Sequence, residues 1–282
     1  MAKKDKRKHK KQKRKASKEG FTAKTADKHV LYELSVQNVE DEIKFLDEAY
    51  RDLRNRPAKS LREDFAGTSA AACEWVRTGE NRQAWAVDID ADVLSWGRAR
   101  HVSKLSAEQQ QRIELVEGDV LEVNTPPVDM IIAFNFSYFI FKSRDTLRAY
   151  FERARQSIKP DGVLMLDCFG GSEAYEECEE DTDLDDFSYV WDQDSFDPIS
   201  SNIQCYIHFD FPDGSKIRKA FEYDWRLWTL AEIRELLQEA GFKKSTVYWE
   251  GFDEDGEGND DYKPVERGDA DPAWIAYVVA ER

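Results

Sequence analysis

The stretch LREDFAGTSAAACEWVRTGENRQAWAVDID, residues 61–90, decides the fold. It predicts a strand that ends at the turn Ala66-Gly67-Thr68, a helix that Ser69 caps, and a second strand over residues 83–87. Asp88 comes directly after that second strand, where doubly wound sheets place a carboxylate on a ribose. The stretch therefore predicts an α/β fold with a nucleoside site.

The glycine content of the turn narrows the choice of nucleoside. A dinucleotide site needs three glycines so that the backbone can approach a pyrophosphate, but Phe65 and Ser69 stand where the first and third would be. This disfavours NAD and FAD. Together with Glu63, Gly67 and Asp88, the stretch resembles motifs I and II of the class I S-adenosylmethionine-dependent methyltransferases. The alternative is an ordinary α/β turn with a solvated Asp88.

Later segments extend the resemblance to roughly residues 35–282. The apolar run VDMIIAF predicts a central strand buried on both faces. Alternating residues around Pro212-Asp213-Gly214-Ser215 predict a hairpin. The resemblance implies an α/β fold with a doubly wound, mostly parallel seven-stranded sheet, an antiparallel last strand and an inserted antiparallel β-hairpin.

The predicted domain organisation follows from changes in composition. A basic tail without apolar periodicity should be disordered, and a helical pattern after it predicts a lid helix. The predicted parts are the tail at 1–27, the N-terminal lid helix at 28–57, and the methyltransferase domain at 58–282, with acidic insertions at about 173–200 and 252–271 and the hairpin at about 203–224.

The resemblance implies S-adenosyl-L-methionine as the cofactor. Asp88 would bind the ribose, and Ile89 would pack on the adenine face. In the sequence EGDV, Asp119 would accept the adenine amino group and the amide of Val120 would meet a ring nitrogen. The implied cofactor-binding residues are Glu63, Phe65, Ala66, Gly67, Thr68, Asp88, Ile89, Asp119, Val120 and Asn135.

The acceptor side is less well defined by the sequence. In the resembled family, a helix before the first strand commonly covers cofactor and acceptor, which makes Tyr32, Gln37 and Tyr50 lid candidates. Residues 173–197 hold twelve acidic and no basic side chains, interleaved with aromatics. As a lid they would suit a cationic or amine acceptor; a mobile acidic loop is the alternative. The substrate candidates are Tyr32, Tyr50, Tyr138, Trp191 and His208.

The tetrad NFSY at residues 135–138 supplies the catalytic candidates, Asn135 and Tyr138. In methyltransferases that act on the amino groups of nucleic acid bases, the corresponding tetrad is Asn or Asp, two prolines and an aromatic residue. Here Phe136 and Ser137 replace both prolines. Base methylation is therefore an alternative function.

Charge separates the tail from the rest of the chain. Residues 1–29 hold thirteen Lys or Arg and three Asp or Glu, whereas the whole chain has a net charge of −16. The chain after residue 29 is therefore strongly acidic and repels the phosphates of nucleic acids. The basic tail at residues 3–18 could still bind nucleic acid. The four cysteines lack metal-ligand spacing, so no metal is expected. No apolar run approaches a membrane span, which predicts a cytoplasmic protein, or a nuclear one in a eukaryote.

The sequence thus predicts a methyltransferase that moves a methyl group from S-adenosylmethionine to a small-molecule or modest polar acceptor by in-line displacement. Positioning rather than a catalytic triad would supply most of the rate enhancement. The alternatives are base methylation through the NFSY tetrad, aminopropyl transfer on the same fold, and a non-enzymatic RNA-binding protein that uses the fold as a scaffold.

Overall fold

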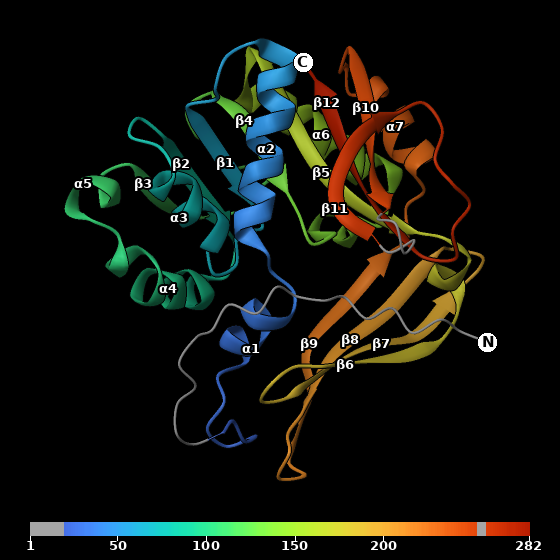
Figure 1. Ribbon diagram of the computed structural model, residues 1–282. Helices are drawn as coiled ribbons and strands as arrows, with labels where there is room; N and C mark the ends of the chain where they lie inside the picture. The colour runs from blue at the N-terminus through green and yellow to red at the C-terminus, as the bar shows by residue number, and fades with distance from the viewer. Residues whose placement is uncertain (1–19, 253–257) are drawn as a thin grey trace.

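The computed structural model describes residues 20–252 and 258–282. Its main sheet has eight strands in the order β11-β10-β12-β5-β4-β1-β2-β3 (Figure 1). The strands are β1 (Ser60–Asp64), β2 (Gln83–Asp88), β3 (Ile113–Glu117), β4 (Val128–Ala133), β5 (Ile158–Gly170), β10 (Lys244–Phe252), β11 (Gly258–Val265) and β12 (Trp274–Glu281).

Strand directions confirm the doubly wound, mostly parallel sheet. β3, β2, β1, β4 and β5 pair in parallel, and the last strand, β12, runs antiparallel between β5 and β10. The prediction of seven strands was wrong, because part of the acidic segment at 252–271 forms β11 and pairs with β10. Residues 253–257 of that segment lie outside the described residues.

Helices cover both faces of the sheet. α2 and α3 share one apolar cluster with the sheet, and α6 and α7 share another on the opposite face. The predicted capping box of α7 is present, since Thr229 and Glu232 bond each other's backbone amides. The helices are α1 (Lys28–Ser35), α2 (Val39–Arg54), α3 (Ala70–Arg77), α4 (Ala91–Arg100), α5 (Ala107–Gln110), α6 (Arg144–Ser157) and α7 (Leu230–Glu239), with single 3₁₀ turns at Val102–Lys104, Ser137–Ile140 and Ser172–Tyr175.

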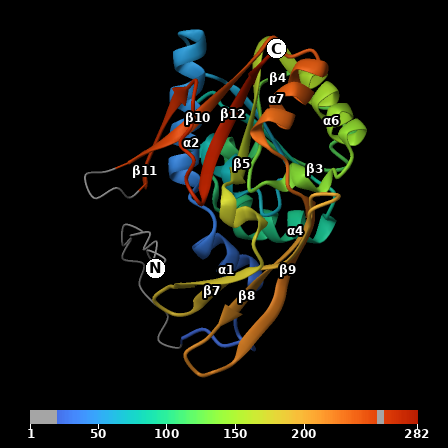
Figure 2. The ribbon, with the colours of Figure 1, turned by 90° about the vertical axis from the view of Figure 1, so that its right-hand side faces the viewer.

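A second, antiparallel sheet extends beneath the main one (Figure 2). It contains β6 (Cys178–Asp183), β7 (Ser188–Asp197), β8 (Asn202–Asp210) and β9 (Lys216–Arg226). β8 and β9 form the expected hairpin. The acidic segment before them, which we expected to be a partly ordered lid, instead supplies the two other strands of the sheet.

The N-terminal region forms two helices rather than one lid helix. α1 packs Leu31 into an apolar cluster with the inner face of the small sheet, whereas α2 lies on the main sheet. Before α1, the ring of Phe21 lies 6.0 Å from that of Phe187. The folded part therefore begins earlier than residue 28, and residues 1–19 of the predicted tail lie outside the described residues. Within the described part, no helix combines the length and apolar character of a membrane span.

Candidate functional site

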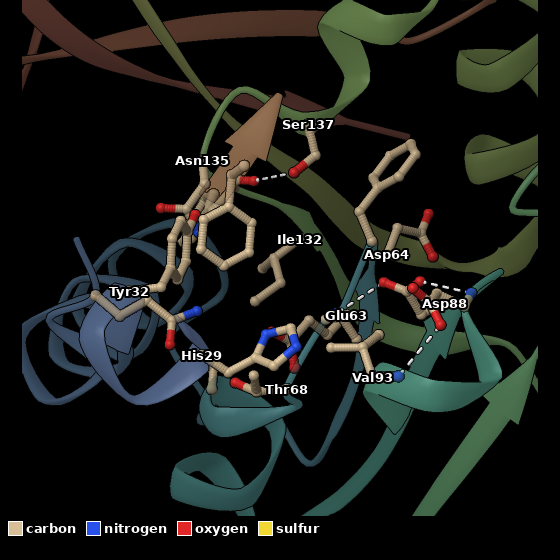
Figure 3. A pocket seen from close by; sticks show the side chains of 18 of the residues that line it. His29, Tyr32, Glu63, Asp64, Thr68, Asp88, Val93, Ile132, Asn135 and Ser137 are labelled. Carbon is tan, nitrogen blue, oxygen red and sulfur yellow. Dashed lines mark hydrogen bonds between the residues drawn. The ribbon is translucent and has the colours of Figure 1, made fainter. Parts of the chain in front are cut away.

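A pocket of about 270 Å³ lies at the carboxyl ends of β1, β2 and β4, the edge where open α/β sheets bind ligands. α1, the start of α2 and strand β9 close it from the opposite side. Figure 3 shows Tyr32 of α1 across the pocket from Glu63 and Asp88. The lining residues are Lys28, His29, Tyr32, Gln37, Glu42, Glu63, Asp64, Phe65, Ala66, Gly67, Thr68, Ala71, Asp88, Asp90, Val93, Ile132, Phe134, Asn135, Ser137, Phe221 and Tyr223.

The turn after β1 keeps a glycine-like backbone although two of its glycines are replaced. Phe65, Gly67 and Ser69 all adopt left-handed conformations, with φ of 57°, 50° and 59°. Such angles are costly for residues with a side chain. No atom lies within 4 Å of the position that a Cβ on Gly67 would occupy. The turn therefore presents open backbone to the pocket.

Asp88 is held at the end of β2 by the backbone around it. One carboxylate oxygen accepts the amide of Gly67 at 2.7 Å, and the other accepts the amide of Asp90 at 2.9 Å. Each oxygen still has a lone pair for a further donor. Asp88 lines the pocket and can accept hydrogen bonds from vicinal hydroxyl groups.

Glu63 joins β1 to the start of α3. Its carboxylate accepts the backbone amide of Ala72 at 2.9 Å. Burial raises the pKa of this carboxyl to about 8, and the charges of Glu42 and Asp88 act in the same direction. A cation in the pocket would favour its ionised form.

Asp64 lies beneath the turn in a buried ion pair. Arg62 donates two hydrogen bonds to it, Nε to Oδ1 at 2.6 Å and Nη2 to Oδ2 at 3.1 Å, and the Tyr150 hydroxyl adds a third at 3.0 Å. Both members of the pair have fully buried side chains. This pairing fixes the strand end from which the turn departs.

Asp167 on β5 was not predicted from the sequence. Its two oxygens accept the backbone amides of Asn135 and Phe136 at 2.6 and 2.9 Å. Both of those residues have a φ of 57°, so the carboxylate holds an unusual turn that places Asn135 in the pocket. The sequence contained a signal for this role. Asp167 is the one acid in the apolar run VLMLDCF, and a buried acid needs hydrogen-bond or charge partners.

Glu42 on α2 was not predicted from the sequence either, whereas Gln37, just before that helix, was a lid candidate. Both line the pocket, as the lid candidate Tyr32 does. Burial raises the pKa of the Glu42 carboxyl to about 7. Gln37 Oε1 is buried and has no hydrogen-bond partner among the described residues. The sequence showed only a helix start rich in acids, which is usually a capping signal.

Three implied cofactor residues lie outside the pocket lining. Ile89 follows Asp88 but is 73% exposed, and Val120 is buried with its carbonyl 3.5 Å from Arg62 Nη2. Asp119 is half-buried and accepts the amide of Leu121 at 2.8 Å. These three residues lie near the ends of β2 and β3. Their roles in binding adenine stay predictions.

Two aromatic substrate candidates point away from the pocket. The Tyr50 hydroxyl lies 3.3 Å from Asp129, a residue at the amino end of β4, and therefore at the wrong edge of the sheet. Tyr138 is fully buried in the core, and its hydroxyl donates to the carbonyl of Asp167 at 2.7 Å. Neither side chain can contact an acceptor in this pocket.

Trp191 and His208 also lie outside the lining. The Trp191 ring is 6.0 Å from that of Tyr223, which does line the pocket. His208 alternates along β8 with Ile207 and Phe209, which face α1, so its side chain is on the opposite face of the small sheet.

His208 belongs instead to a group with Glu179 and Asp192, whose ligand atoms lie within 4.8 Å of one another. Its Nδ1 accepts the amide of Lys219 at 2.7 Å, which places the ring proton on Nε2, toward Asp192 Oδ2 at 3.1 Å. In this tautomer His208 offers no lone pair to a metal, so the group is a hydrogen-bonded cross-strand cluster.

Comparison with solved structures identifies the architecture. No protein-family model matches the chain, and no curated protein matches its sequence. An S-adenosylmethionine-dependent methyltransferase from Clostridium acetobutylicum matches with a TM-score of 0.66 and 18% identity, over 90% of this chain and 96% of its own. CalS10, an amino pentose methyltransferase from Micromonospora echinaspora, gives 0.64 and 15%, over 90% and 95%. The glycopeptide N-methyltransferase MtfA gives 0.53 and 17%, over 87% and 95%. The chain therefore has the fold of the class I S-adenosylmethionine-dependent methyltransferases.

Proposed function

We propose that this protein is an S-adenosylmethionine-dependent methyltransferase that acts on a small polar acceptor. The observation that carries the proposal is the position of Asp88, whose oxygens are held by the amides of Gly67 and Asp90 at the mouth of an open turn. This arrangement suits a ribose with two free hydroxyl groups. The exposed side chain of Ile89 next to it offers an apolar surface to an adenine.

The charge of the pocket supports a cofactor without phosphates. Glu63 and Asp88 line it, and a pyrophosphate there would face their two carboxyl groups, whereas the charge of Asp64 is neutralised by Arg62. S-Adenosylmethionine carries an ammonium and a sulfonium, which such groups attract. Thr68 Oγ1, buried in the lining and without a partner among the described residues, adds a hydrogen-bonding group for a ligand.

When bound, S-adenosylmethionine supplies a methyl group that its sulfonium already activates. The residues of this chain would bind and orient the cofactor: Asp88 would hold the ribose, and Glu63 and the turn at Asn135 would border the rest of the molecule. Proximity and orientation of this kind contribute roughly 7 to 11 kcal/mol to barrier reduction. Residues of α1 and β9 cover part of the pocket.

The geometry gives less support to base methylation. In that alternative Tyr138 would stack on a nucleic acid base, but its ring is buried and its hydroxyl is bonded to Asp167. The solved neighbours support a small acceptor, since CalS10 is described as an amino pentose methyltransferase and MtfA as a glycopeptide N-methyltransferase.

Calorimetric titration with S-adenosylmethionine, S-adenosylhomocysteine and NADH tests the cofactor. We expect the first two to bind and NADH not to bind. Asp88→Ala should weaken binding tenfold or more, because both ribose hydroxyls lose their acceptor. Asp92→Ala, an exposed change on the neighbouring helix α4, is the matched control and should leave the affinity unchanged. If the wild-type protein binds neither adenosyl compound, the proposal is wrong.

A further inference from the structure

We propose that the methyl acceptor is an aliphatic amine that binds between α1, the start of α2 and β9, and that Glu42 receives a proton from its ammonium form. This inference rests on the proposed function and adds to it the chemical class of the acceptor and a residue that acts on it.

The acceptor position follows from which elements line the pocket. The turns after β1, β2 and β4 border the part assigned to the cofactor. The remaining wall comes from the helical lid and the small sheet, through Tyr32, Gln37, Glu42, Phe221 and Tyr223. The rings of Tyr32 and Phe221 lie 4.9 Å apart. Two aromatic rings beside two hydrogen-bond acceptors make a surface for a cation with an apolar body.

The hydrogen-bond acceptors on this wall favour a ligand with several hydrogen-bond donors. Gln37 Oε1 is buried and has no partner among the described residues. The Glu42 carboxylate accepts the backbone amide of Asn38, but no basic side chain in the described part of the chain pairs with it. An ammonium group offers up to three N–H donors and a positive charge. A hydroxyl offers one donor and leaves the charge of Glu42 uncompensated.

The charges of the residues near Glu42 also favour an amine acceptor. Glu63 on β1 and Asp167 on β5 are near enough to Glu42 for their charges to interact. Cationic groups lie at the α1 side of the pocket, where Lys28 Nζ is 5.0 Å from the centre of the Phe221 ring. The titratable groups that line the pocket with Glu42 are Lys28, His29 and Tyr32 on α1, Glu63 and Asp64 on β1, Asp88, Asp90, and Tyr223 on β9. Asp41 on α2 and Asp167 on β5 also interact with Glu42 through their charges. An acceptor carboxylate or phosphate would meet an excess of acids.

Glu42 is suited to take the proton of such an amine. An aliphatic ammonium has a pKa near 10.4 and no lone pair, so it must lose a proton before it reacts. In the proposed step an N–H bond breaks, the proton goes to a carboxylate oxygen of Glu42, and the electron pair stays on nitrogen. That pair then forms the new N–C bond to the methyl group, while the bond from this methyl group to sulfur breaks and its electron pair stays on sulfur. Burial raises the pKa of Glu42 to about 7, close to the value at which a base works best at neutral pH.

Binding of matched probes tests the acceptor class without turnover. The full-length protein, saturated with S-adenosylhomocysteine, is titrated calorimetrically with benzylamine and benzyl alcohol, and with glucosamine and glucose. We expect the amine of at least one pair to bind tenfold or more tighter than its hydroxyl partner. Glu42→Gln should abolish that preference, whereas Glu48→Gln, an exposed change on the same helix, should keep it.

The outcomes separate this inference from the proposed function. If S-adenosylhomocysteine does not bind, the proposed function itself is wrong. If it binds but neither amine is preferred over its partner, or if the preference survives Glu42→Gln, the amine inference is wrong. Glu42→Asp, which keeps the charge on a shorter side chain, should retain the preference and shows that loss in Glu42→Gln is not loss of the lid.

A pH profile tests the proton transfer. With the preferred amine and labelled S-adenosylmethionine, kcat/KM of the wild type should fall about tenfold per pH unit below pH 7, as Glu42 becomes protonated. In Glu42→Gln this limb should be absent, while the limb set by the pKa of the chosen amine remains. A wild-type limb that persists in Glu42→Gln would show that another group takes the proton.

Discussion

The Asp167 carboxylate on β5 accepts the backbone amide of Asn135 at 2.6 Å and so shapes the turn after β4. The same carboxylate holds the amide of Phe136, and both turn residues are left-handed. A residue from one parallel strand thus sets the conformation at the end of its neighbour.

Asp167→Asn should damage this turn. The amide side chain has one oxygen to accept a hydrogen bond, so one of the two buried N–H groups loses its partner, at a cost of about 1–3 kcal/mol. Chemical denaturation at pH 8 should show that loss, and calorimetry should show weaker binding of S-adenosylhomocysteine. Asp224→Asn removes an exposed carboxylate on β9 and should change neither quantity. Equal effects of the two variants would contradict this role of Asp167.

Glu63 should make the stability of the ligand-free protein depend on pH. Its pKa rises from an ordinary 4.5 to about 8 on folding, because the carboxyl is buried. The folded state therefore holds the proton more tightly, and the free energy of unfolding falls as pH rises from 4.5 to about 8, by up to about 1.4 kcal/mol per unit. Glu42 and Asp167, with pKa values of about 7, add to this fall at lower pH.

Glu63→Gln isolates the contribution of that carboxyl. Between pH 7 and 8, where Glu42 and Asp167 pass from about half to mostly ionised in both proteins, the wild type should lose stability faster than the variant in denaturation curves. A cationic ligand favours the ionised carboxylate, so S-adenosylmethionine should bind the wild type more tightly as pH rises from 6 to 8. The variant should lose most of that dependence. Parallel curves for the two proteins would show that Glu63 is ionised throughout.

Ser69→Gly should stabilise the protein by roughly 1 kcal/mol. Ser69 has a φ of 59°, and its buried hydroxyl has no hydrogen-bond partner among the described residues. Glycine removes both the backbone cost and the unsatisfied hydroxyl. Ser95→Gly, on the exposed face of α4, should destabilise by about 0.5–1 kcal/mol, because a helix interior disfavours glycine. Thermal unfolding tests whether Ser69→Gly raises the stability and Ser95→Gly lowers it. A loss of stability in both variants would contradict the prediction.

Phe65 shows why the sequence alone left this turn uncertain. It has the same left-handed backbone as Ser69, but its ring packs 5.7 Å from that of Tyr150 and 5.9 Å from that of Phe141. Packing across the sheet offsets a local backbone cost, so a glycine position can hold a phenylalanine. Local pattern identified Glu63, Gly67 and Asp88, because strand, turn and acid follow one another in sequence.

Residues that depend on contacts between distant segments were harder to predict. Asp167 and Glu42 act across more than one element, and their local sequence suggests only a buried strand and a helix start. Tyr50 was assigned to the acceptor site because the resemblance implies a lid helix before the first strand, and His208 because it lies in the predicted hairpin. The tertiary fold places Tyr50 at the opposite edge of the main sheet and His208 on the outer face of the small one.

Gly97→Ala should destabilise the protein, although alanine has a higher helix propensity than glycine. Gly97 lies on α4, and a Cβ there would be 2.2 Å from the carbonyl oxygen of Thr68, in the turn that lines the pocket. The clash with backbone should cost about 1–3 kcal/mol, more than the roughly 1 kcal/mol that alanine adds to helix propensity. It should also weaken cofactor binding, because the turn must move. Ser95→Ala on the same helix should be neutral or stabilising in both measurements, and the same result for Gly97→Ala would contradict the close approach.

Asp129→Asn should separate stability from binding. Asp129 is 1% exposed at the amino end of β4, where its carboxylate contacts Arg56 at 3.0 Å and Lys159 at 3.1 Å and accepts the amides of Lys59 and Ser60. Burial alone would raise its pKa, but these bonds hold the pKa well below 3.8, so its stabilising effect is present above that pH and is lost as pH falls below it.

Removing this charge leaves Lys159 without its ion-pair partner and Arg56 with Asp161 alone, at a cost of about 2–4 kcal/mol, since both cations are partly solvated. Asp161→Asn, which removes an exposed partner of Arg56, should cost less than about 1 kcal/mol. Because Asp129 lies at the edge of the sheet opposite the pocket, affinity for S-adenosylhomocysteine, measured calorimetrically well below the unfolding temperature, should match the wild type in both variants. A loss of affinity in Asp129→Asn would mean that the two edges of the sheet are coupled through β4.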